Sequence, residues 1–327
     1  MGVRTLHQTD LFHPHQDPDD HYDLACQFAL AARGDISLQG VLIDWPPSFA
    51  EGDPDVMAVA QLNAIAGLSV PAGIGSPMAG APMTGGERLL LRALESPGDR
   101  LTIHIVGSCR DVASAIGRAP DLFRERCAAI YLNAGSAVDN GRLEYNVELD
   151  PASYAGVFSA PCPVYWMPCF HAVPDWGRED MAVGRHGTFY RFVQRDLLDG
   201  LSPAMQNYFL YMLTRSEDPR WLKALSAPVD AEALARFGAL TRNMWCTGGF
   251  LHAAALSVDA EGNVIRGTHG GLYDFVPVDV RCAPDGRTEW QHRPAEGASR
   301  FLFTLRDEAR YPAAMTRAMG WLLRQLT

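Results

Sequence analysis

Short apolar segments alternate with helix-like segments through the first half of the chain, and this alternation limits the folds that the sequence can adopt. Strand-like segments lie at residues 4–9, 37–44, 69–75, 101–107 and 128–135. Helical patterns separate them, such as Leu24, Phe28 and Ala31 on one face of residues 20–33. Strands joined through helices pair in parallel and are covered on both faces. The sequence therefore predicts an α/β fold with a mostly parallel, Rossmann-like central sheet and helices on both faces.

The rest of the chain is expected to belong to the same domain. Asp-Pro pairs at residues 53–54 and 150–151 predict helix starts, because Asp caps free amide groups and Pro fits the first helical position. The pattern is mainly helical over residues 187–237, with an apolar helix near 245–258, antiparallel strands near 263–280 and a last amphipathic helix at 311–326. We predict a single domain over residues 1–327, with the mainly helical region near 187–255 contributing to the active-site wall.

Composition excludes several classes of function. The net charge of −10, without a long Lys/Arg run, argues against binding to nucleic acid or to an anionic membrane. No segment has the length needed to cross a bilayer, and the N-terminal residues lack the apolar core of a signal peptide, so we expect a cytoplasmic protein. The seven cysteines form no CxxC pair, which predicts free, mostly buried thiols rather than a zinc site.

The segment from Thr9 to Ala25 concentrates ionisable side chains at a strand-to-helix corner. It reads TDLFHPHQDPDDHYDLA and contains five aspartates and three histidines, namely Asp10, Asp17, Asp19, Asp20, Asp23, His13, His15 and His21. Crowded carboxylates repel one another unless a cation or shared protons offset their charge. One interpretation is a site for a hard divalent metal. The other is a solvated turn whose acids cap the helix.

Residues that directly follow the predicted strands are the other candidates for a site. In parallel sheets ligands bind beyond the carboxyl ends of the strands. Those positions hold Asp10 with the acidic segment, Asp44 with Trp45, residues 107–111 and residues 133–136. We therefore expect these residues to meet at one edge of the sheet.

Several motifs follow one another in order over roughly the first 255 residues. They are Thr9-Asp10 with Asp19-Asp20 after an apparent insertion, AVAQLNAIAGLSVPAGIGSP, IHIVGSCRDVASAIGRAPDLF, AAIYLNAGSA, GRLEYNVELDPASYAGVF and FLHAAAL. This order resembles the inosine-uridine preferring nucleoside hydrolases. Their patterns at these places are Asp-Thr-Asp-Pro-Gly-x-Asp-Asp, a second helix with a third strand, Gly-Pro-Leu-Thr-Asn, Met-Gly-Gly, Glu-Phe-Asn-x-x-x-Asp-Pro-Glu-Ala and His-Asp-Pro-Leu. The resemblance implies a nucleoside-hydrolase-like α/β domain.

The resemblance also implies a reaction, the metal-assisted hydrolysis of the N-glycosidic bond of a ribonucleoside or related N-ribosyl compound. In that family a calcium ion held by aspartates binds the ribose 2′- and 3′-hydroxyls. A metal-bound water, activated by an Asp base, attacks the anomeric carbon. Calcium accepts many oxygen ligands, and nearby carboxylates stabilise the oxocarbenium-like transition state. The partner implied is a small ribosyl substrate, and the family's habit suggests a homodimer or homotetramer.

Residue roles follow from the same resemblance. Asp10 matches the general base and a metal ligand, with Asp17 as a rival for the base. Asp19 and Asp20 match the paired acids, Asp19 contacting substrate as well as metal. The backbone carbonyl of Arg110 matches another metal ligand. The substrate-binding positions are Asn133, in the place of a pocket methionine, and Glu144 with Asn146, which match a pair on the ribose 5′ side. His252 matches the histidine that protonates the leaving base.

The chain departs from the family pattern at two metal-binding positions. An aspartate that ligates calcium is replaced by Ala253, and Arg110 brings a cation near the expected ion. The inserted HPHQD offers His13, His15 and Asp17 as further candidate ligands, a set that suits a transition metal better than calcium. His13 and His15 would point the same way on an extended backbone; the alternative is that both are loop histidines contacting the carboxylates.

Two other functions stay open on these residues. One is a degenerate, non-catalytic family member that binds a ribosyl or sugar-like ligand, which Ala253 favours. The other is a hydrolase with a rebuilt His/Asp transition-metal site. His252, surrounded by alanines, is equally compatible with a structural histidine, and Glu144 with an exposed strand residue that shares a face with Asn146.

Overall fold

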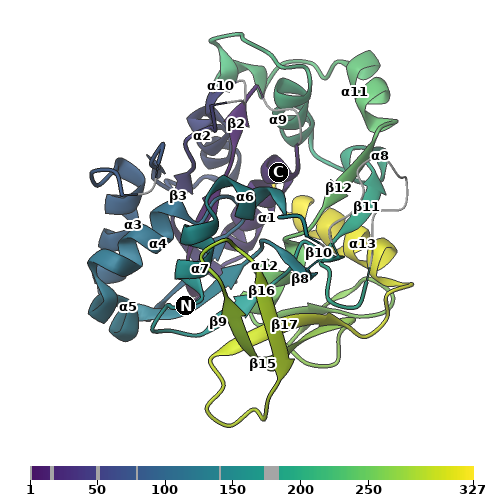
Figure 1. Ribbon diagram of the computed structural model, residues 1–327. Coiled ribbons are helices and arrows are strands. Elements are labelled where there is room, and N and C mark those ends of the chain that lie inside the picture. Colours follow the sequence, from purple (N-terminus) through teal and green to yellow (C-terminus); the bar gives the residue numbers. More distant parts are fainter. Residues whose placement is uncertain (1, 15–17, 49–51, 79, 140, 173–183) are drawn as a thin grey trace.

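A nine-stranded sheet forms the centre of the molecule (Figure 1). The computed structural model describes residues 2–14, 18–48, 52–78, 80–139, 141–172 and 184–327. The strands run in the order β16-β15-β17-β9-β7-β6-β1-β3-β5. Their bounds are β1 Val3–Thr9, β3 Ile36–Ile43, β5 Ala72–Ile74, β6 Leu101–Ile105, β7 Cys127–Leu132, β9 Val164–Trp166, β15 Tyr273–Cys282, β16 Thr288–His292 and β17 Arg300–Leu305.

The pairing confirms the predicted mostly parallel sheet. Parallel ladders join β5, β3, β1, β6, β7, β9 and β17 in sequence across the sheet. Only β15 pairs antiparallel, with β17 on one side and β16 on the other, among the pairings of this sheet in the described residues. The strands β16 and β17 were not predicted. The residues of β16 are exposed or half-buried and lack a continuous apolar run.

Helices cover both faces of the sheet, as predicted. One face packs against α1 (Asp19–Ala32), α2 (Val56–Ala66), α9 (Pro203–Leu213), α12 (Thr247–Ala253) and α13 (Tyr311–Leu323), whose apolar residues share one core. The other face packs against α3 (Gly85–Glu95), α4 (Arg110–Arg118), α5 (Pro120–Arg126) and α7 (Pro151–Val157), which share a second core. Figure 1 shows α3, α4 and α5 grouped together in blue at one side.

The region near 187–255 is less helical than predicted. Between its helices α8 (Arg195–Leu198), α9, α10 (Trp221–Ala224), α11 (Ala231–Gly238) and α12 it contains two strands, β11 (Tyr190–Val193) and β12 (Thr241–Met244), which pair antiparallel. In the tail, β13 (Leu256–Val258) pairs with β14 (Val264–Arg266). The remaining short elements are β2 (Phe12–His13), β4 (Asp53–Pro54), β8 (Ser136–Val138), α6 (Tyr145–Leu149) and β10 (Phe170–Ala172).

One of the two predicted Asp-Pro helix starts is correct and the other is shifted. Asp150 accepts a hydrogen bond from the backbone N–H of Ser153 at 2.9 Å and caps α7, as expected. Asp53 and Pro54 instead form β4, which pairs with β2. Asp55 caps α2 by accepting from the N–H of Ala58 at 2.9 Å. Two carboxylates compete for this cap, and Asp55 is the one that also receives a buried hydrogen bond from His21.

The C-terminal hairpin of β15 and β16 reaches the loops at the carboxyl edge of the sheet. The indole N–H of Trp290 in β16 donates to the carbonyl oxygen of Ala137 in β8 at 2.7 Å. A Cβ placed on Gly286, in the turn of the hairpin, would lie 2.6 Å from the side chain of Val147 in α6. The hairpin therefore braces the segment that carries α6.

Among the described residues, none of the helices combines the length and hydrophobicity that crossing a membrane requires.

Candidate functional site

Four neighbouring strands end at the same edge of the sheet, and polar side chains directly follow three of them. Asp10 follows β1, Asp44 follows β3, Gly107 lies two residues after β6, and Asn133 follows β7. Because β3, β1, β6 and β7 are adjacent and parallel, their carboxyl ends meet. The structure thus brings together the strand-end positions that the sequence predicted.

Asp10 lies in the middle of a group of buried or half-buried carboxylates. Burial, together with repulsion from Asp19 and Asp44, raises the pKa of Asp10 well above its usual range, although a hydrogen bond between its side chain and Asp20 opposes this. Thr9 donates its hydroxyl to Oδ1 of Asp20 at 2.5 Å. Asp10, Asp19 and Asp20 therefore meet at the corner between β1 and α1, as the sequence predicted.

Asp44 joins this group from the next strand, and the motifs predicted no role for it beyond its strand-end position. The side chain of Gln8 and the backbone N–H of Ser108 donate to its two oxygens, the latter at 2.6 Å. Burial and repulsion from Asp111 raise the pKa of Asp44 to about 7. Gly107 makes this approach possible, since a Cβ there would lie 2.6 Å from Oδ2 of Asp44 and 2.8 Å from the nitrogen of Asp10.

Glu144 and Asn146 enter the site from α6, not from the strand that the sequence pattern suggested. Glu144 is the N-cap of α6, because its Oε1 accepts the backbone N–H of Asn146 at 3.0 Å. Its Oε2 accepts the N–H of Gly135 at 2.7 Å. Burial raises the pKa of Glu144. Residues two apart lie on the same face of a strand, and the N-cap of a helix also contacts the residue two positions on. Both structures therefore bring Glu144 and Asn146 together, so the sequence pattern alone does not distinguish a strand from a helix start.

Two buried amides contribute hydrogen-bond acceptors to this edge. Asn133 donates through Nδ2 to the carbonyl oxygen of Met167 at 2.7 Å and to the hydroxyl of Thr188 at 3.2 Å. Asn146 donates through Nδ2 to the carbonyl oxygen of Val106 at 3.2 Å. Within the described part of the chain, Oδ1 of each amide is buried without a hydrogen-bond partner. A ligand that carries hydroxyl donors would satisfy both oxygens.

The helix α12 approaches the acids at its N-terminal end, and His252 lies near its other end. Its Nδ1 is 2.7 Å from the hydroxyl of Tyr131, and its ring packs against Tyr165 and Phe275. Burial lowers its pKa to about 4. Cys246, the N-cap of α12, is the residue whose side chain bonds to Asp23. The structure therefore does not place His252 with Asp10 and the other acids.

His13 also faces away from the acids that the sequence grouped it with. Its Nε2 is 2.8 Å from the carbonyl oxygen of Ser216, its ring stacks on Tyr211, and its Nδ1 is 3.8 Å from Oδ2 of Asp55. The other two candidate ligands of the insertion, His15 and Asp17, lie outside the described residues.

Arg110 begins α4 and its guanidinium is held by three acceptors. It donates to the hydroxyl of Ser108 at 3.1 Å and to the carbonyl oxygens of Pro77 at 2.8 Å and Trp45 at 3.1 Å. Its charge lowers the pKa of Asp44 against the stronger effect of burial. The positive side chain thus supports the loop after β3 and faces Asp44.

The carboxylates of Asp10, Asp19 and Asp20 lie at the corner where the resemblance implies a calcium ion. Their carboxylate oxygens are donors of the type that calcium takes. However, in the ranges described, no three His, Cys, Asp or Glu side chains are grouped so that they could hold a metal ion. Asp10 and Asp20 are hydrogen-bonded to each other, and the thiol of Cys246 bonds to Asp23.

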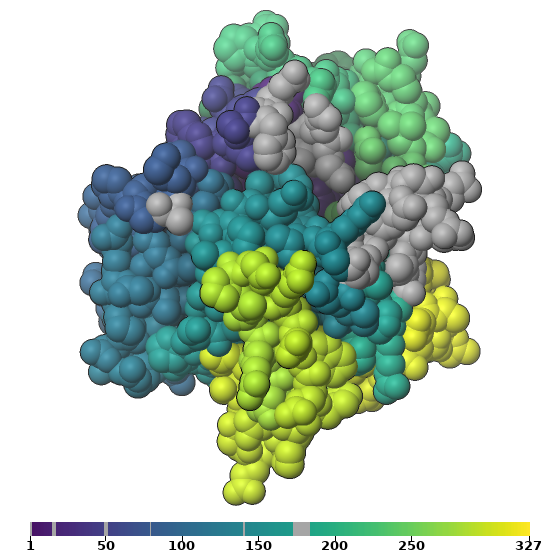
Figure 2. Space-filling view, in the orientation of Figure 1, coloured from purple at the N-terminus to yellow at the C-terminus, as the bar shows by residue number. Residues whose placement is uncertain are grey.

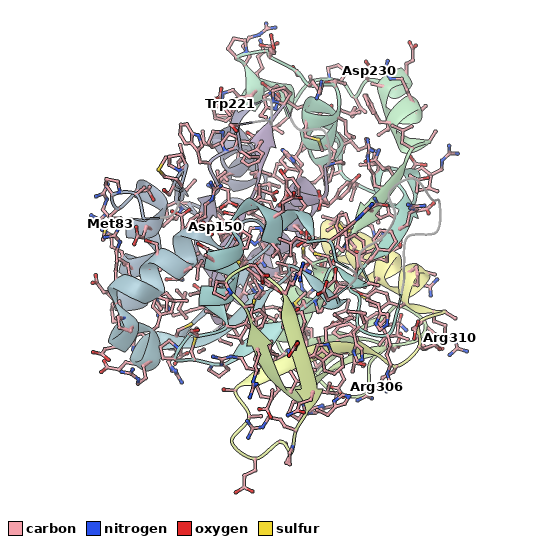
Figure 3. All side chains as sticks on the ribbon, viewed as in Figure 1. Met83, Asp150, Trp221, Asp230, Arg306 and Arg310 are labelled. Atoms are coloured by element: carbon pink, nitrogen blue, oxygen red, sulfur yellow. The ribbon has the colours of Figure 1, made fainter. Side chains whose placement is uncertain are left out.

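A cavity of about 570 Å³ opens beside the acids. Its lining residues are Trp45, Pro46, Pro47, Ser48, Pro77, Arg110, Tyr145, Glu148 and Leu149. They come from the loop after β3, the loop after β5, the start of α4, and α6. In Figure 2 the teal segment around α6 lies near the middle of the visible face, beside the blue part of the surface. Figure 3 labels Asp150, the residue that directly follows α6 and caps α7.

Comparison with solved structures assigns the fold. The model aligns with a plant nucleoside hydrolase, PpNRh1, with a TM-score of 0.58 and 14% identity over 98% of this chain and 99% of that one. The fold is that of the nucleoside hydrolases. The effector protein XOO4466 aligns with a TM-score of 0.59 and 17% identity, covering 100% of this chain and 95% of the other.

A further neighbour was solved with a ribosyl ligand. It is the type III effector XopQ complexed with adenosine diphosphate ribose, at a TM-score of 0.57 and 16% identity over 100% of this chain and 95% of that one. The sequence itself matches no protein-family model and no curated protein. The nucleoside-hydrolase fold that the motifs predicted is thus confirmed by structure.

Proposed function

We propose that the protein hydrolyses the N-glycosidic bond of a ribonucleoside or related N-ribosyl compound. The observation that carries this proposal is the pairing of buried carboxylates with the two unpartnered amide oxygens of Asn133 and Asn146. A sugar supplies hydroxyl donors for the amides, and carboxylates stabilise the positive charge that develops as a glycosidic bond breaks. The nucleoside-hydrolase fold supports the same reaction.

Asp10 is the proposed general base. Burial among other acids makes its carboxylate more basic than an exposed aspartate, which favours removal of a proton from water. Asp20 is hydrogen-bonded to Asp10 and orients it, while Asp44 adds negative charge from the next strand. The water oxygen attacks the anomeric carbon as its bond to the base nitrogen breaks. Asn133, Glu144 and Asn146 hold the sugar, with Asp19 as a further substrate contact.

The test of this proposal is the substitution Asp10→Asn, with release of ribose from a panel of nucleosides as the readout. An amide of the same size cannot accept the proton, so we expect the rate to fall by about 100-fold or more. Asp150→Asn is the control, because Asp150 is a half-buried aspartate whose side chain caps α7. The proposal is wrong if Asp10→Asn keeps ribose release within threefold of the unchanged protein.

Calcium stays a prediction that rests on the resemblance, and the proposed reaction contains no step through it. The residues that would hold it are Asp10, Asp19, Asp20 and the backbone carbonyl of Arg110. The metal content of the purified protein, measured together with ribose release before and after chelation, tests this prediction. Calcium that leaves together with activity supports it. Zinc, iron or manganese in its place would support the rebuilt site that includes His13, His15 and Asp17.

A protein that binds a ribosyl ligand without hydrolysing it is the second candidate. The lack of a metal-holding group among the described side chains favours it. Calorimetric titration with adenosine and adenosine diphosphate ribose separates the two functions. Binding without ribose release, in a protein that contains no metal, supports the second candidate and contradicts the first. Homodimer or homotetramer assembly and a cytoplasmic location also stay predictions.

A further inference from the structure

An irregularity at the start of β7 turns a cysteine toward a second cysteine. In the ladder between β6 and β7, Leu101 pairs with Cys127 but Thr102 pairs with Ala129, so β7 holds one extra residue there. Because side chains alternate between the two faces of a strand, an extra residue turns Cys127 to the face that it would otherwise not occupy. The core on that face also contains Cys162, which lies two residues before β9.

The two thiols meet in this core. Cys127 is 0% exposed and Cys162 is 4% exposed, and their side chains are hydrogen-bonded to each other. The backbones beside them belong to paired strands, since the N–H of Ile130 in β7 donates to the carbonyl oxygen of Pro163 at 2.9 Å. Paired strands lie about 4.8 Å apart, which is within the range of about 4.4–6.8 Å between Cα atoms that a disulfide spans.

Two arginines lie beside these thiols. Arg300 in β17 donates to the carbonyl oxygen of Cys162 at 3.0 Å, and Arg100 donates to the carbonyl oxygen of Cys127. The hydrogen bond from Cys127 and the charges of both arginines lower the pKa of Cys162, although burial opposes them. Burial raises the pKa of Cys127 well above its usual range. Because the thiolate is the reactive form of cysteine, Cys162 is the nucleophile of the pair.

The other cysteines of the chain lack this combination. Cys282 is the half-buried one, whereas the other six are buried, yet burial raises the pKa of its thiol to about 12. Burial also raises the pKa of Cys26, Cys109, Cys169 and Cys246. Among the seven cysteines, all of which the structure describes, Cys162 is therefore the one best suited to react with an oxidant.

We propose that Cys127 and Cys162 are an oxidation site, at which hydrogen peroxide converts the two thiols into a reversible disulfide. The Cys162 thiolate attacks one peroxide oxygen, the O–O bond breaks, and a sulfenic acid forms while the other oxygen leaves as water. The Cys127 sulfur then attacks the sulfenic sulfur, the S–O bond breaks, and the proton of Cys127 leaves with the oxygen as a second water. Two thiols are oxidised by two electrons and one peroxide is reduced. This inference does not depend on the proposed hydrolysis.

The disulfide would close a segment that carries part of the candidate site. Asn133, Glu144 and Asn146 all lie between Cys127 and Cys162 in the sequence. Both cysteines precede their strands, β7 and β9, whereas the candidate site lies at the carboxyl edge of the same sheet. A disulfide limits the unfolded chain more than the folded one. Oxidation should therefore stabilise the fold at a place remote from the site.

Peptide mapping of the full chain after treatment with hydrogen peroxide tests the proposal. Trypsin releases residues 127–142, in which Cys127 is the one cysteine, and residues 143–178, which contain Cys162 and Cys169. Mass spectrometry without reduction should find these peptides linked through Cys162, at peroxide concentrations at least tenfold below those that oxidise Cys282. Oxidation of Cys282 first, or of Cys162 to its sulfinic acid without a link to Cys127, would overturn the proposal.

Variants separate the roles of the two thiols. In Cys127→Ala the disulfide cannot form, so the sulfenic acid of Cys162 should persist and react with dimedone. Cys26→Ala is the matched control, because Cys26 is equally buried but lies in the core on the other face of the sheet, and it should form the disulfide as the unchanged protein does. Dimedone labelling of Cys127 in place of Cys162, in the variant Cys162→Ala, to the same extent would contradict the assignment of the nucleophile.

Thermal unfolding measures the effect of the closed segment. Oxidation of the unchanged protein should raise the midpoint of unfolding by about 4 °C or more, and dithiothreitol should reverse the rise. Cys127→Ala should show no rise with peroxide, while Cys26→Ala should show the full one. A midpoint that stays the same or falls when the disulfide is present would contradict the stabilising effect. Where a variant fails to fold, the peptide map of the unchanged protein still decides whether the disulfide forms.

Discussion

Gly107, two residues after β6, lies directly against Asp10 and Asp44. A Cβ at this position would lie 2.6 Å from the Asp44 carboxylate and 3.0 Å from the side chain of Gln8. Distances this short force a displacement of the neighbouring groups. The role of this glycine in bringing Asp44 to the site cannot be read from its place in the motif IHIVGSC alone.

We expect Gly107→Ala to lower the rate of ribose release by about tenfold or more, because small displacements of catalytic groups have large effects on rate. Gly117→Ala is the control, since a Cβ on this glycine of α4 meets nothing within 4 Å. The control should keep activity and gain up to about 1 kcal/mol in the free energy of unfolding. Equal activity of both variants in a ribose-release assay would show that the close approach at Gly107 is not needed.

The position of His252 leads to a prediction about pH and stability. Its folded-state pKa of about 4 lies below the ordinary value of about 6.5. At a pH between these two values, unfolding therefore takes up a proton. The contribution of neutral, buried His252 to stability is fully present above pH 6.5 and is lost as the pH falls toward 4. We expect His252→Gln to flatten the rise of the free energy of unfolding between pH 4 and 6.5, as measured by urea denaturation.

The same variant decides whether His252 protonates the leaving group. A residue packed among Tyr131, Tyr165 and Phe275 should change kcat for inosine by less than threefold. A proton donor would instead show a large fall in kcat for inosine. That pattern would contradict the placement of His252 outside the site.

Single residues explain which parts of the site could be predicted from the sequence. Asp10, Asp19 and Asp20 follow a strand and open a helix, so their meeting depends on local structure that periodicity reveals. Asn133 follows β7 and was found in the same way. Cys246 was missed, because its contact with Asp23 joins two helices more than 200 positions apart and leaves no local pattern. His252 drew attention as the single histidine of an apolar helix, but which face of the helix meets the acids is decided by tertiary packing.

At the scale of elements, the start of α2 joins a helix cap to a buried hydrogen bond between side chains. Asp55 accepts from the N–H of Ala58 and from Nε2 of His21, the latter at 3.0 Å. Burial alone would raise the pKa of Asp55, but the hydrogen bonds outweigh it and the pKa lies below the usual value. This interaction fixes α2 against α1 directly beside the acidic corner.

We expect Asp55→Asn to lower the free energy of unfolding by about 1.5–3 kcal/mol at pH 7, the range for a hydrogen bond to a charged group. Asp150→Asn is the matched variant, because it alters a cap of the same 2.9 Å length without a histidine partner and should cost less. Since the folded-state pKa of Asp55 is lowered, its stabilisation is present above pH 4 and is lost as the pH falls through the folded-state value. Denaturation curves at pH 7 and pH 3 measure this; a difference between the variants that persists at pH 3 would contradict the account.

The elements also show where sequence periodicity stops being informative. The parallel strands β1, β3, β5, β6 and β7 and the helices α1, α3 and α4 were predicted because a buried strand or an amphipathic helix has a clear pattern. The cap at Asp55 was assigned to Asp53, two residues away, because both are aspartates and only the contact with His21 separates them. Likewise, Glu144 starts a five-residue helix, α6, which is too short to show a helical period.

At the scale of the whole molecule, the fold is shared with proteins that are at most 17% identical in the structural alignments described above. The layered arrangement depends on apolar residues at the right period, which many sequences supply. The proposed hydrolysis depends on single side chains, such as the carboxylate of Asp10. A fold can therefore persist while the residues at its ligand-binding edge change.

The hydrogen bond between Trp290 of β16 and Ala137 of β8 can form only late in the synthesis of the chain. Asp10, Asp44, Asn133 and Glu144 all belong to the first half of the chain, yet the loop that carries Glu144 rests on a hairpin formed by residues 273–292. A ribosome delivers the acids long before it delivers the hairpin. The nascent chain thus holds its complete set of site residues without the support that fixes α6, and it gains a finished ligand-binding edge only after the last strands have left the exit tunnel.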